Sequence, residues 1–173
     1  MSNMSTLFIS VAYDSKNGIG KDNSIPWYLP EDLKHFSKLT KGNGNNAIIM
    51  GKNTWLSLPK KPLKGRDNLI LSRTLKVNDN LPKNDLIKSF EKINDVIDFC
   101  ILQNYDEVWV IGGSEIYSLF LKNYKISKIY ATLIEKDYEC DVFFPDINNW
   151  KIISKEEKEK DGVKISYLVF ENN

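Results

Sequence analysis

The feature that most constrains the fold is a regular alternation of short apolar runs with helical patterns. The apolar runs, rich in β-branched residues, lie at 7–13, 47–50, 68–71 and 108–111. Helical spacing of apolar residues occurs at 30–40, in a short piece from residue 52, at 90–103 and at 115–121. Because parallel strands need a crossover connection, this rhythm predicts βαβ units around a parallel sheet.

The pattern changes after residue 126, where strands are expected to follow one another without helices. Apolar runs at 129–134, 150–154 and 163–170 predict an antiparallel end to the sheet. The charged run at 155–161 joins the last two, and we expect it to be a solvated hairpin connection. The Asn- and Gly-rich segment at 41–46 is expected to be a flexible connection between helix and strand.

Composition limits the classes of partner. A chain of 173 residues can bury one sizeable core, so we expect one globular domain over 1–173. Its 24 basic and 23 acidic residues leave a net charge of +1, which gives no strong field for nucleic acid or an anionic membrane. Residues 6–13 predict a strand rather than a secretion signal, and no apolar run approaches the roughly 20 residues of a membrane helix. The partner is therefore expected to be a small molecule.

Cysteine and histidine usage narrows the chemistry further. Cys100 and Cys140 lack metal-ligand spacing and do not indicate a disulfide scaffold, which fits a reducing, cytoplasmic compartment. His35 is the only histidine, so a Ser-His-Asp arrangement or a multi-histidine metal site would need residues that this chain lacks. We expect no metal centre, and we expect His35 to be a surface or half-buried helix residue.

An acidic residue lies within an apolar helical stripe. Asp32 shares one face of the predicted helix with Leu29, Leu33, Phe36 and Thr40, by three- and four-residue spacing. Asp32 could simply complement the positive end of the helix dipole. Alternatively, since a charge on a buried face is costly unless it is partnered, a polar ligand could be its partner.

Two predicted strand-to-helix junctions contain glycine, MGKNT at 50–54 and IGGSE at 111–115. Glycine allows close approach of a ligand, and the helix start that follows offers unpaired N–H groups to an anion. Taken singly, each is weak evidence. The first is not a P-loop because Asn46 stands where that motif needs glycine, and the second has only two adjacent glycines, unlike a Rossmann fingerprint. Lys52 and Arg73 are basic residues suited to nearby phosphates.

Arg66 follows Gly65 just before the predicted strand at 68–71. Its guanidinium could clamp a carboxylate in bidentate fashion. An exposed turn arginine is the other interpretation, and the surrounding sequence alone does not decide between them.

Together and in this order, these motifs resemble the dihydrofolate reductase family over residues 9–170. The similar segments are NGIGKDNSIPWYLPEDLKHF at 17–36, IIMGKNTW at 48–55, PLKGRDNLILSR at 62–73, VIGGSEIY at 110–117 and DVFFPD at 141–146. The resemblance implies a single α/β domain with a mainly parallel eight-stranded central sheet, flanking helices and an antiparallel C-terminal hairpin. It also implies an adenosine-binding subdomain at roughly 46–103.

The resemblance assigns roles on the substrate side. Asp32 matches the acid that binds the pterin ring, Thr132 the threonine hydrogen-bonded to that acid, and Trp27 lies in the loop that closes over the nicotinamide. These three are the expected catalytic residues. Those expected to contact the rest of dihydrofolate are Phe36, Leu58, Leu63, Ile111 and Arg66, the last as the clamp for the glutamate carboxylate.

The cofactor implied by the resemblance is NADPH. Lys52, Ser72 and Arg73 match contacts around its 2′-phosphate, and Asn53 and Glu115 stand where some relatives have basic side chains. The remaining expected contacts with the cofactor are Ala12, Ile19, Gly20, Gly51, Thr54, Gly112, Gly113, Ser114, Ile116 and Tyr117.

The activity implied is hydride transfer to pterin C6 with protonation at N5, a step of tetrahydrofolate synthesis and one-carbon metabolism. Asp32 would stabilise the protonated pterin electrostatically, with water as the proton donor. Other interpretations are the pyrimidine reductase of riboflavin synthesis, which shares the fold, and a non-catalytic pterin- or nucleotide-binding module. Expected ligands include antifolate inhibitors, and the expected state is a monomer unless the chain is fused to or associated with thymidylate synthase.

Overall fold

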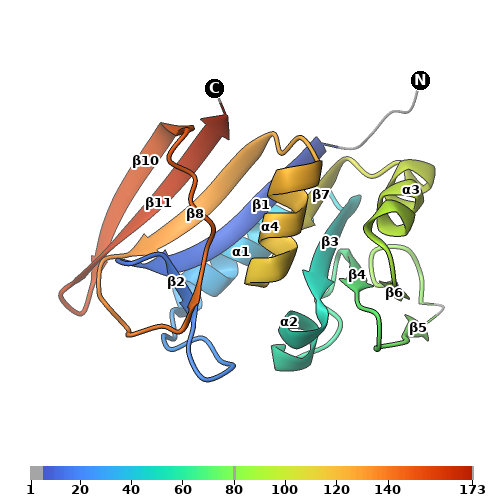
Figure 1. Ribbon diagram of the computed structural model, residues 1–173, viewed down its shortest axis with the longest axis horizontal. Helices are drawn as coiled ribbons and strands as arrows, with labels where there is room; N and C mark the ends of the chain where they lie inside the picture. Colours follow the sequence, from blue (N-terminus) through green and yellow to red (C-terminus); the bar gives the residue numbers. More distant parts are fainter. Residues whose placement is uncertain (1–5, 80, 173) are drawn as a thin grey trace.

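The computed structural model describes residues 6–79 and 81–172 (Figure 1). Within these ranges, nine strands form the main sheet in the order β10-β11-β8-β1-β7-β3-β4-β6-β5. The strands are β1 (Thr6–Asp14), β3 (Asn46–Gly51), β4 (Asp67–Leu71), β5 (Asn78–Asp79), β6 (Ile87–Phe90), β7 (Glu107–Val110), β8 (Lys128–Ile134), β10 (Trp150–Lys160) and β11 (Val163–Asn172). A separate small sheet pairs β2 (Gly18–Gly20) with β9 (Val142–Phe143).

Strand pairing confirms the predicted α/β fold. The neighbours from β8 through β1, β7, β3 and β4 to β6 are all parallel, whereas β11 runs antiparallel to both β8 and β10. The main sheet in the described residues has nine strands rather than the expected eight. The two-residue β5 accounts for this difference, because it pairs antiparallel with β6 at the edge.

Two predictions at the level of single elements were wrong. Residue 90 was expected to begin a helix, but it ends β6, and α3 (Ile93–Gln103) begins three residues later. The run at 155–161 was expected to be a loop, but β10 continues to Lys160. The connection is only Asp161 and Gly162, both with positive φ, as a two-residue hairpin turn requires. Charged residues suit this strand because it is the exposed edge of the sheet.

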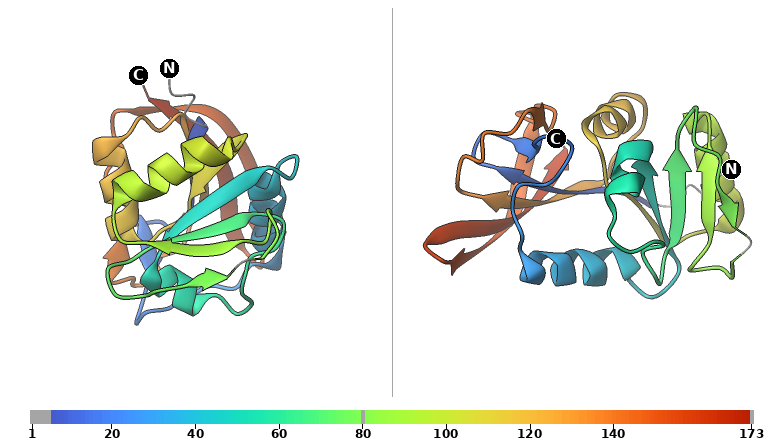
Figure 2. Two further views of the ribbon diagram at one scale, coloured as in Figure 1. Left: turned by 90° about the vertical axis from the view of Figure 1, so that its right-hand side faces the viewer. Right: turned by 90° about the horizontal axis from the view of Figure 1, so that it is seen from below.

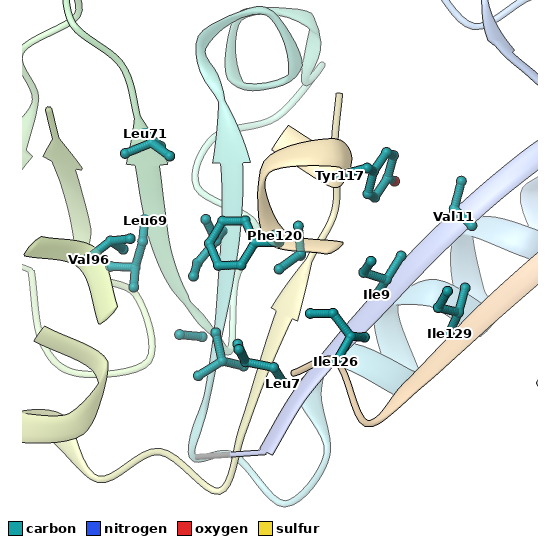
Figure 3. Close-up of a cluster of buried hydrophobic side chains, with 14 of the residues drawn as sticks. Leu7, Ile9, Val11, Leu69, Leu71, Val96, Tyr117, Phe120, Ile126 and Ile129 are labelled. Carbon is teal, nitrogen blue, oxygen red and sulfur yellow. The ribbon is translucent and has the colours of Figure 1, made fainter. Parts of the chain in front are cut away.

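The helices cover both faces of the sheet. Figure 2 shows α1 (Pro30–Lys41) on the opposite side of the sheet from α4 (Ser114–Asn123). The main buried cluster joins α3 and α4 to the sheet, with Phe120 of α4 packed near Leu7, Ile9 and Ile126 (Figure 3). A second cluster includes Trp55 of the short α2 (Lys52–Ser57) and, at its margin, Leu39 of α1. No helix within the described ranges is both long and apolar enough to cross a membrane.

Candidate active site

Asp32 lies in the first turn of α1, which begins at Pro30. Proline is well suited to this position because its fixed φ matches the helix and its missing N–H would be unpaired there anyway. The hydroxyl of Thr132, in the middle of β8, donates to Asp32 Oδ1 at 2.7 Å. Thr132 itself pairs with Ala12 of β1 and Tyr167 of β11. The acid is therefore held over β8, which lies between β1 and β11 in the sheet.

The environment of Asp32 favours its protonated form. Burial raises the pKa of the carboxyl above its ordinary value, and the Thr132 hydroxyl and the nearby His35 oppose that shift. Among the residues that the structure describes, no ion pair includes Asp32. The more exposed Glu31 also lies in the first turn and can interact with the helix dipole from solvent. Asp32 is thus a half-buried acid that forms no ion pair within the described ranges.

The apolar face of α1 is less buried than its periodicity predicts. Thr40 is the buried residue of this helix, whereas Leu33 is 57% exposed. Phe36 is half-buried. The expectation of a buried stripe was therefore wrong for Leu33, because α1 packs on the sheet mainly through its C-terminal half. The N-terminal half of the face forms an open wall.

Arg66 is buried, so the interpretation as an exposed turn arginine is wrong. Its side chain donates to the Lys64 carbonyl from Nε at 3.0 Å and from Nη2 at 2.6 Å, and to Thr40 Oγ1 from Nη1 at 3.0 Å. The guanidinium lies 6.0 Å from the centre of the Phe36 ring. Burial lowers the pKa of Arg66 to about 10. No acidic side chain in the described part of the chain forms an ion pair with it.

Helix α1 therefore connects two opposite charges. Asp32 lies in its first turn, and Thr40, the partner of Arg66, lies in its last turn. Eight residues separate them, which corresponds to about 12 Å along a helix axis. Phe36 lies halfway between. The arrangement suits an elongated ligand with a protonatable ring at one end and a carboxylate at the other.

Apolar side chains from three other segments lie on the same side of the sheet. Leu58 follows α2, Leu63 precedes β4 and Ile111 follows β7, and all three are partly buried against the second hydrophobic cluster. The sequence segments that contain them are far apart, and the sheet order brings them together. They form an apolar surface beside the face of α1.

The two glycine junctions lie side by side, because β3 and β7 are neighbouring parallel strands. The N–H of Gly51 donates to the carbonyl of Gly112 at 2.8 Å. Gly112 has a φ of +119°, which favours glycine, and an added Cβ would lie 3.3 Å from the Tyr117 ring. The Tyr117 hydroxyl donates to the Ser10 carbonyl at 2.7 Å, so this ring is part of the support beneath the junction.

The start of α4 is open to a ligand. Gly113 caps this helix without any side-chain hydrogen bond, and the nearest atom to an added Cβ would be Thr54 Oγ1 at 3.9 Å. Ser114 is the first helical residue, and Glu115 is exposed. The free N–H groups and the space around them fit a phosphate group. Since α2 has only six residues, α4 supplies the stronger helix terminus.

Two exposed cations lie at the neighbouring junction. Lys52 Nζ donates to Thr74 Oγ1 at 3.1 Å, which brings α2 next to the loop after β4. In that loop the Ser72 hydroxyl accepts the N–H groups of Thr74 and Leu75, and Arg73 is exposed. The cations predicted from the sequence thus belong to segments that touch. Asn53 is exposed on α2.

The segment after β1 holds the expected cofactor contacts Ile19 and Gly20. Ile19 and Gly20 are half-buried on β2, and the N–H of Asp141 donates to the Gly20 carbonyl at 2.9 Å. Ile19 and Ile116 both pack at the margin of the main cluster. The ring of Trp27 lies 5.2 Å from that of Tyr138, centroid to centroid.

A cavity of about 310 Å³ borders Asp32 on the side of the β10–β11 hairpin. Its lining consists of Leu29, Glu31, Asp32, Lys158, Glu159, Lys160, Ile165 and Tyr167. None of the lining residues belongs to the apolar surface beside α1 or to the Arg66 end. The surface along α1 described above is therefore distinct from this cavity, and Asp32 belongs to both.

Comparison with known proteins gives a consistent result. The family model for dihydrofolate reductase matches residues 6–172. A viral dihydrofolate reductase of Saimiriine herpesvirus 2 is 35% identical, with 93% of this chain and 82% of that protein aligned. The dihydrofolate reductase of Aedes albopictus is 31% identical over 97% of this chain and 98% of its own length. That of Gallus gallus is 33% identical, and the alignment covers 94% of each chain.

Proposed function

This chain belongs to the dihydrofolate reductase family, and we propose that it reduces dihydrofolate to tetrahydrofolate with NADPH as the hydride donor. The observation that carries the proposal is that the Asp32 carboxyl and the Arg66 guanidinium lie at opposite ends of α1. Dihydrofolate has a pterin with an amino group and ring nitrogens at one end, and a glutamate carboxylate at the other. Phe36, Leu58, Leu63 and Ile111 would contact the rings between these ends.

Each end of the surface along α1 matches its part of the substrate chemically. The Asp32 carboxylate would accept hydrogen bonds from the pterin 2-amino group and N3, with Thr132 fixing its orientation. The buried Arg66, which has no acidic partner among the described side chains, would gain one from the substrate. A charge-assisted bidentate pair of this kind is stronger than hydrogen bonds between neutral groups.

The junctions at Gly51 and Gly112 fit a dinucleotide cofactor. The start of α4, with Gly113 and Ser114, would hold its diphosphate, assisted by Thr54. Lys52, Ser72 and Arg73 would surround a 2′-phosphate, which is why we propose NADPH rather than NADH. We also propose that residues 46–103 form the adenosine-binding subdomain. The nicotinamide end would then lie against Ala12, Ile19, Gly20 and Tyr117.

The cofactor, when bound, supplies a hydride to C6 of the pterin. The protein would hold the two rings in contact and keep bulk water away, and this positioning of the reacting groups raises the rate. Ionised Asp32 would stabilise positive charge on the ring as N5 takes up a proton. Asp32 would face the edge of the pterin opposite N5, so we propose that a water molecule beside N5 is the proton donor. The loop that contains Trp27 would close over the nicotinamide.

An absorbance assay of NADPH consumption tests this proposal. The purified protein should oxidise NADPH only when dihydrofolate is present, and should leave the aminopyrimidine substrate of riboflavin synthesis unchanged. Oxidation with the aminopyrimidine alone would assign the chain to the other reductase. Binding of dihydrofolate without any NADPH oxidation would instead indicate a non-catalytic module.

A further inference from the structure

Asp14 ends β1 with a carboxylate that is fully buried. Its Oδ1 accepts the backbone N–H groups of Lys16 at 2.9 Å and Gly18 at 2.7 Å, and its Oδ2 accepts that of Tyr138 at 3.0 Å. None of the ion pairs in the described part of the chain includes Asp14. The negative charge is therefore held almost entirely by peptide N–H groups, an arrangement that lowers the pKa of the carboxyl.

These hydrogen bonds join two segments that are distant in the sequence. Lys16 lies in the connection from β1 to β2 and Gly18 is the first residue of β2, whereas Tyr138 precedes β9. The thiol of Cys140 also interacts with the Asp14 carboxylate. Gly18 packs closely against both of these side chains, because an added Cβ at Gly18 would collide with Cys140 and lie 2.9 Å from Asp14 Oδ1. One buried side chain thus links β2 to the segment that precedes β9.

Strand β2 contains two of the residues that would contact the nicotinamide. β2 begins at Gly18 and continues through Ile19 and Gly20. Its pairing with β9 is extended by two backbone hydrogen bonds, from Phe144 to the Asn17 carbonyl at 2.8 Å and from Asp141 to that of Gly20 at 2.9 Å. Any displacement of the Asp14 carboxylate would therefore move Ile19 and Gly20.

We infer that Asp14 is a positioning residue, whose buried carboxylate fixes β2 against the segment before β9 and thereby places Ile19 and Gly20 against the nicotinamide. This inference rests on the proposed function for the identity of the ligand. It depends on charge as well as shape, because a carboxylate accepts on both oxygens. An asparagine of the same size would accept hydrogen bonds on its one oxygen only. Its NH₂ group, in place of the second carboxylate oxygen, would face peptide N–H groups that are also donors.

Asp67 offers a matched control. It is equally buried, its Oδ1 accepts the N–H groups of Asn84 at 2.6 Å and Leu86 at 3.1 Å, and its Oδ2 accepts the Tyr105 hydroxyl at 2.6 Å. It begins β4, whereas the glycine junctions follow the carboxyl ends of the parallel strands. Asp67→Asn should therefore remove a similar buried network without affecting β2.

Amide hydrogen exchange of the ligand-free protein is the first test. Asp14→Asn should speed exchange at Lys16, Gly18 and Tyr138 by about tenfold or more beyond any global change, since hydrogen bonds to charged groups contribute about 1.5 to 3 kcal/mol. Asp67→Asn should leave these amides unchanged and speed exchange at Asn84 and Leu86. Unchanged exchange at Gly18 and Tyr138 in Asp14→Asn would overturn the inference.

Single-turnover hydride transfer with both ligands saturating is the second test. The rate should fall about tenfold in Asp14→Asn and stay within about twofold of wild type in Asp67→Asn, because misplacement of reacting groups is costly. A wild-type rate in Asp14→Asn would overturn the inference while the proposed function stands. Absence of turnover in the wild type would overturn both. If Asp14→Asn does not fold, Asp14→Ser, which can still accept one N–H, serves the same comparison.

Discussion

Asp32 is subject to two opposing requirements, because the burial that suits it to the pterin also destabilises its charged form. The pKa is raised in the folded protein, so the folded state binds this proton more tightly than the unfolded chain, whose carboxyl titrates near 3.9. The free energy of unfolding contributed by Asp32 must then fall as pH rises from about 4 towards the raised pKa. At neutral pH the ionised acid is a net cost.

Asp32→Asn should therefore make the ligand-free protein more stable at pH 7. The gain should shrink as the pH falls and vanish below about pH 4, where the acid is protonated in both states. Thermal unfolding of both proteins across this pH range measures the effect. A variant less stable than wild type at pH 7 would show that the Thr132 hydrogen bond, and not burial, dominates the energetics of Asp32.

Arg66→Leu should weaken dihydrofolate binding by about 2 to 5 kcal/mol and leave NADPH affinity nearly unchanged. The leucine removes the buried Arg66 cation, which precedes β4, whereas Gly51 lies at the opposite end of the β3–β4 pair. Equilibrium titrations with each ligand measure both affinities. Lys64→Ala, which removes an adjacent but exposed cation, is the control and should change neither. Equal losses for the two ligands in Arg66→Leu would place the clamp elsewhere.

Arg73→Ala should lower kcat/KM for NADPH about tenfold or more while leaving NADH nearly unaffected. The two cofactors differ only in the 2′-phosphate, and a hydrogen bond to a charged group contributes about 1.5 to 3 kcal/mol. The matched control is Lys76→Ala, since Lys76 is an exposed cation in the same loop but pairs with Glu91 at 3.6 Å. If Arg73→Ala weakens both cofactors equally, the 2′-phosphate site is not at this junction.

At the scale of elements, the β7–α4 junction depends on Gly112 for both its backbone conformation and its space. Gly112→Ala should lower stability and weaken NADPH about tenfold or more, because the methyl group would be strained at a φ of +119° and crowd Tyr117. Gly162 also has a positive φ, +81°, but nothing lies within 4 Å of an added Cβ. Gly162→Ala should therefore lower the melting temperature without changing cofactor affinity. Equal affinities for NADPH in the two variants would contradict this role of Gly112.

The errors in element prediction have identifiable physical causes. Alternating charge at 155–160 resembles a loop in the sequence, yet an exposed edge strand tolerates such residues and its Glu157 pairs with Lys164 across the hairpin. The strand β6 was missed because its sequence, IKSF, is short and has only one fully buried residue, Ile87. Hydrophobic periodicity reveals a strand only when one face is buried, and β6 and β10 have too few buried residues.

At the scale of the whole molecule, the sequence predicted the elements better than their contacts. Each glycine junction could be recognised locally, but only the order of β3 and β7 places Gly51 against Gly112. Asp14 was missed because nothing near it in the sequence marks a carboxylate whose partners include a residue more than a hundred positions away. Such long-range contacts follow from sheet topology, to which local patterns are blind.

At the scale of the whole molecule, the two proposed ligands, dihydrofolate and NADPH, would bind to different parts of one sheet. In the proposed function, α1 would hold the substrate on one face of the sheet, and the junctions after β3 and β7 would hold the cofactor (Figure 1). The reacting rings would meet where the two parts join, near Ala12 at the end of β1. The central claim is that Asp32 at this place makes the pterin a better hydride acceptor.

Single-turnover hydride transfer in wild type and Asp32→Asn at neutral pH tests that claim most directly. Both proteins are loaded with saturating NADPH and dihydrofolate, so differences in binding do not enter the rate. The wild type should oxidise NADPH rapidly, and Asp32→Asn should be slower by about a hundredfold or more, in the range measured for loss of electrostatic stabilisation in other enzymes. A rate in Asp32→Asn close to that of the wild type would contradict the claim.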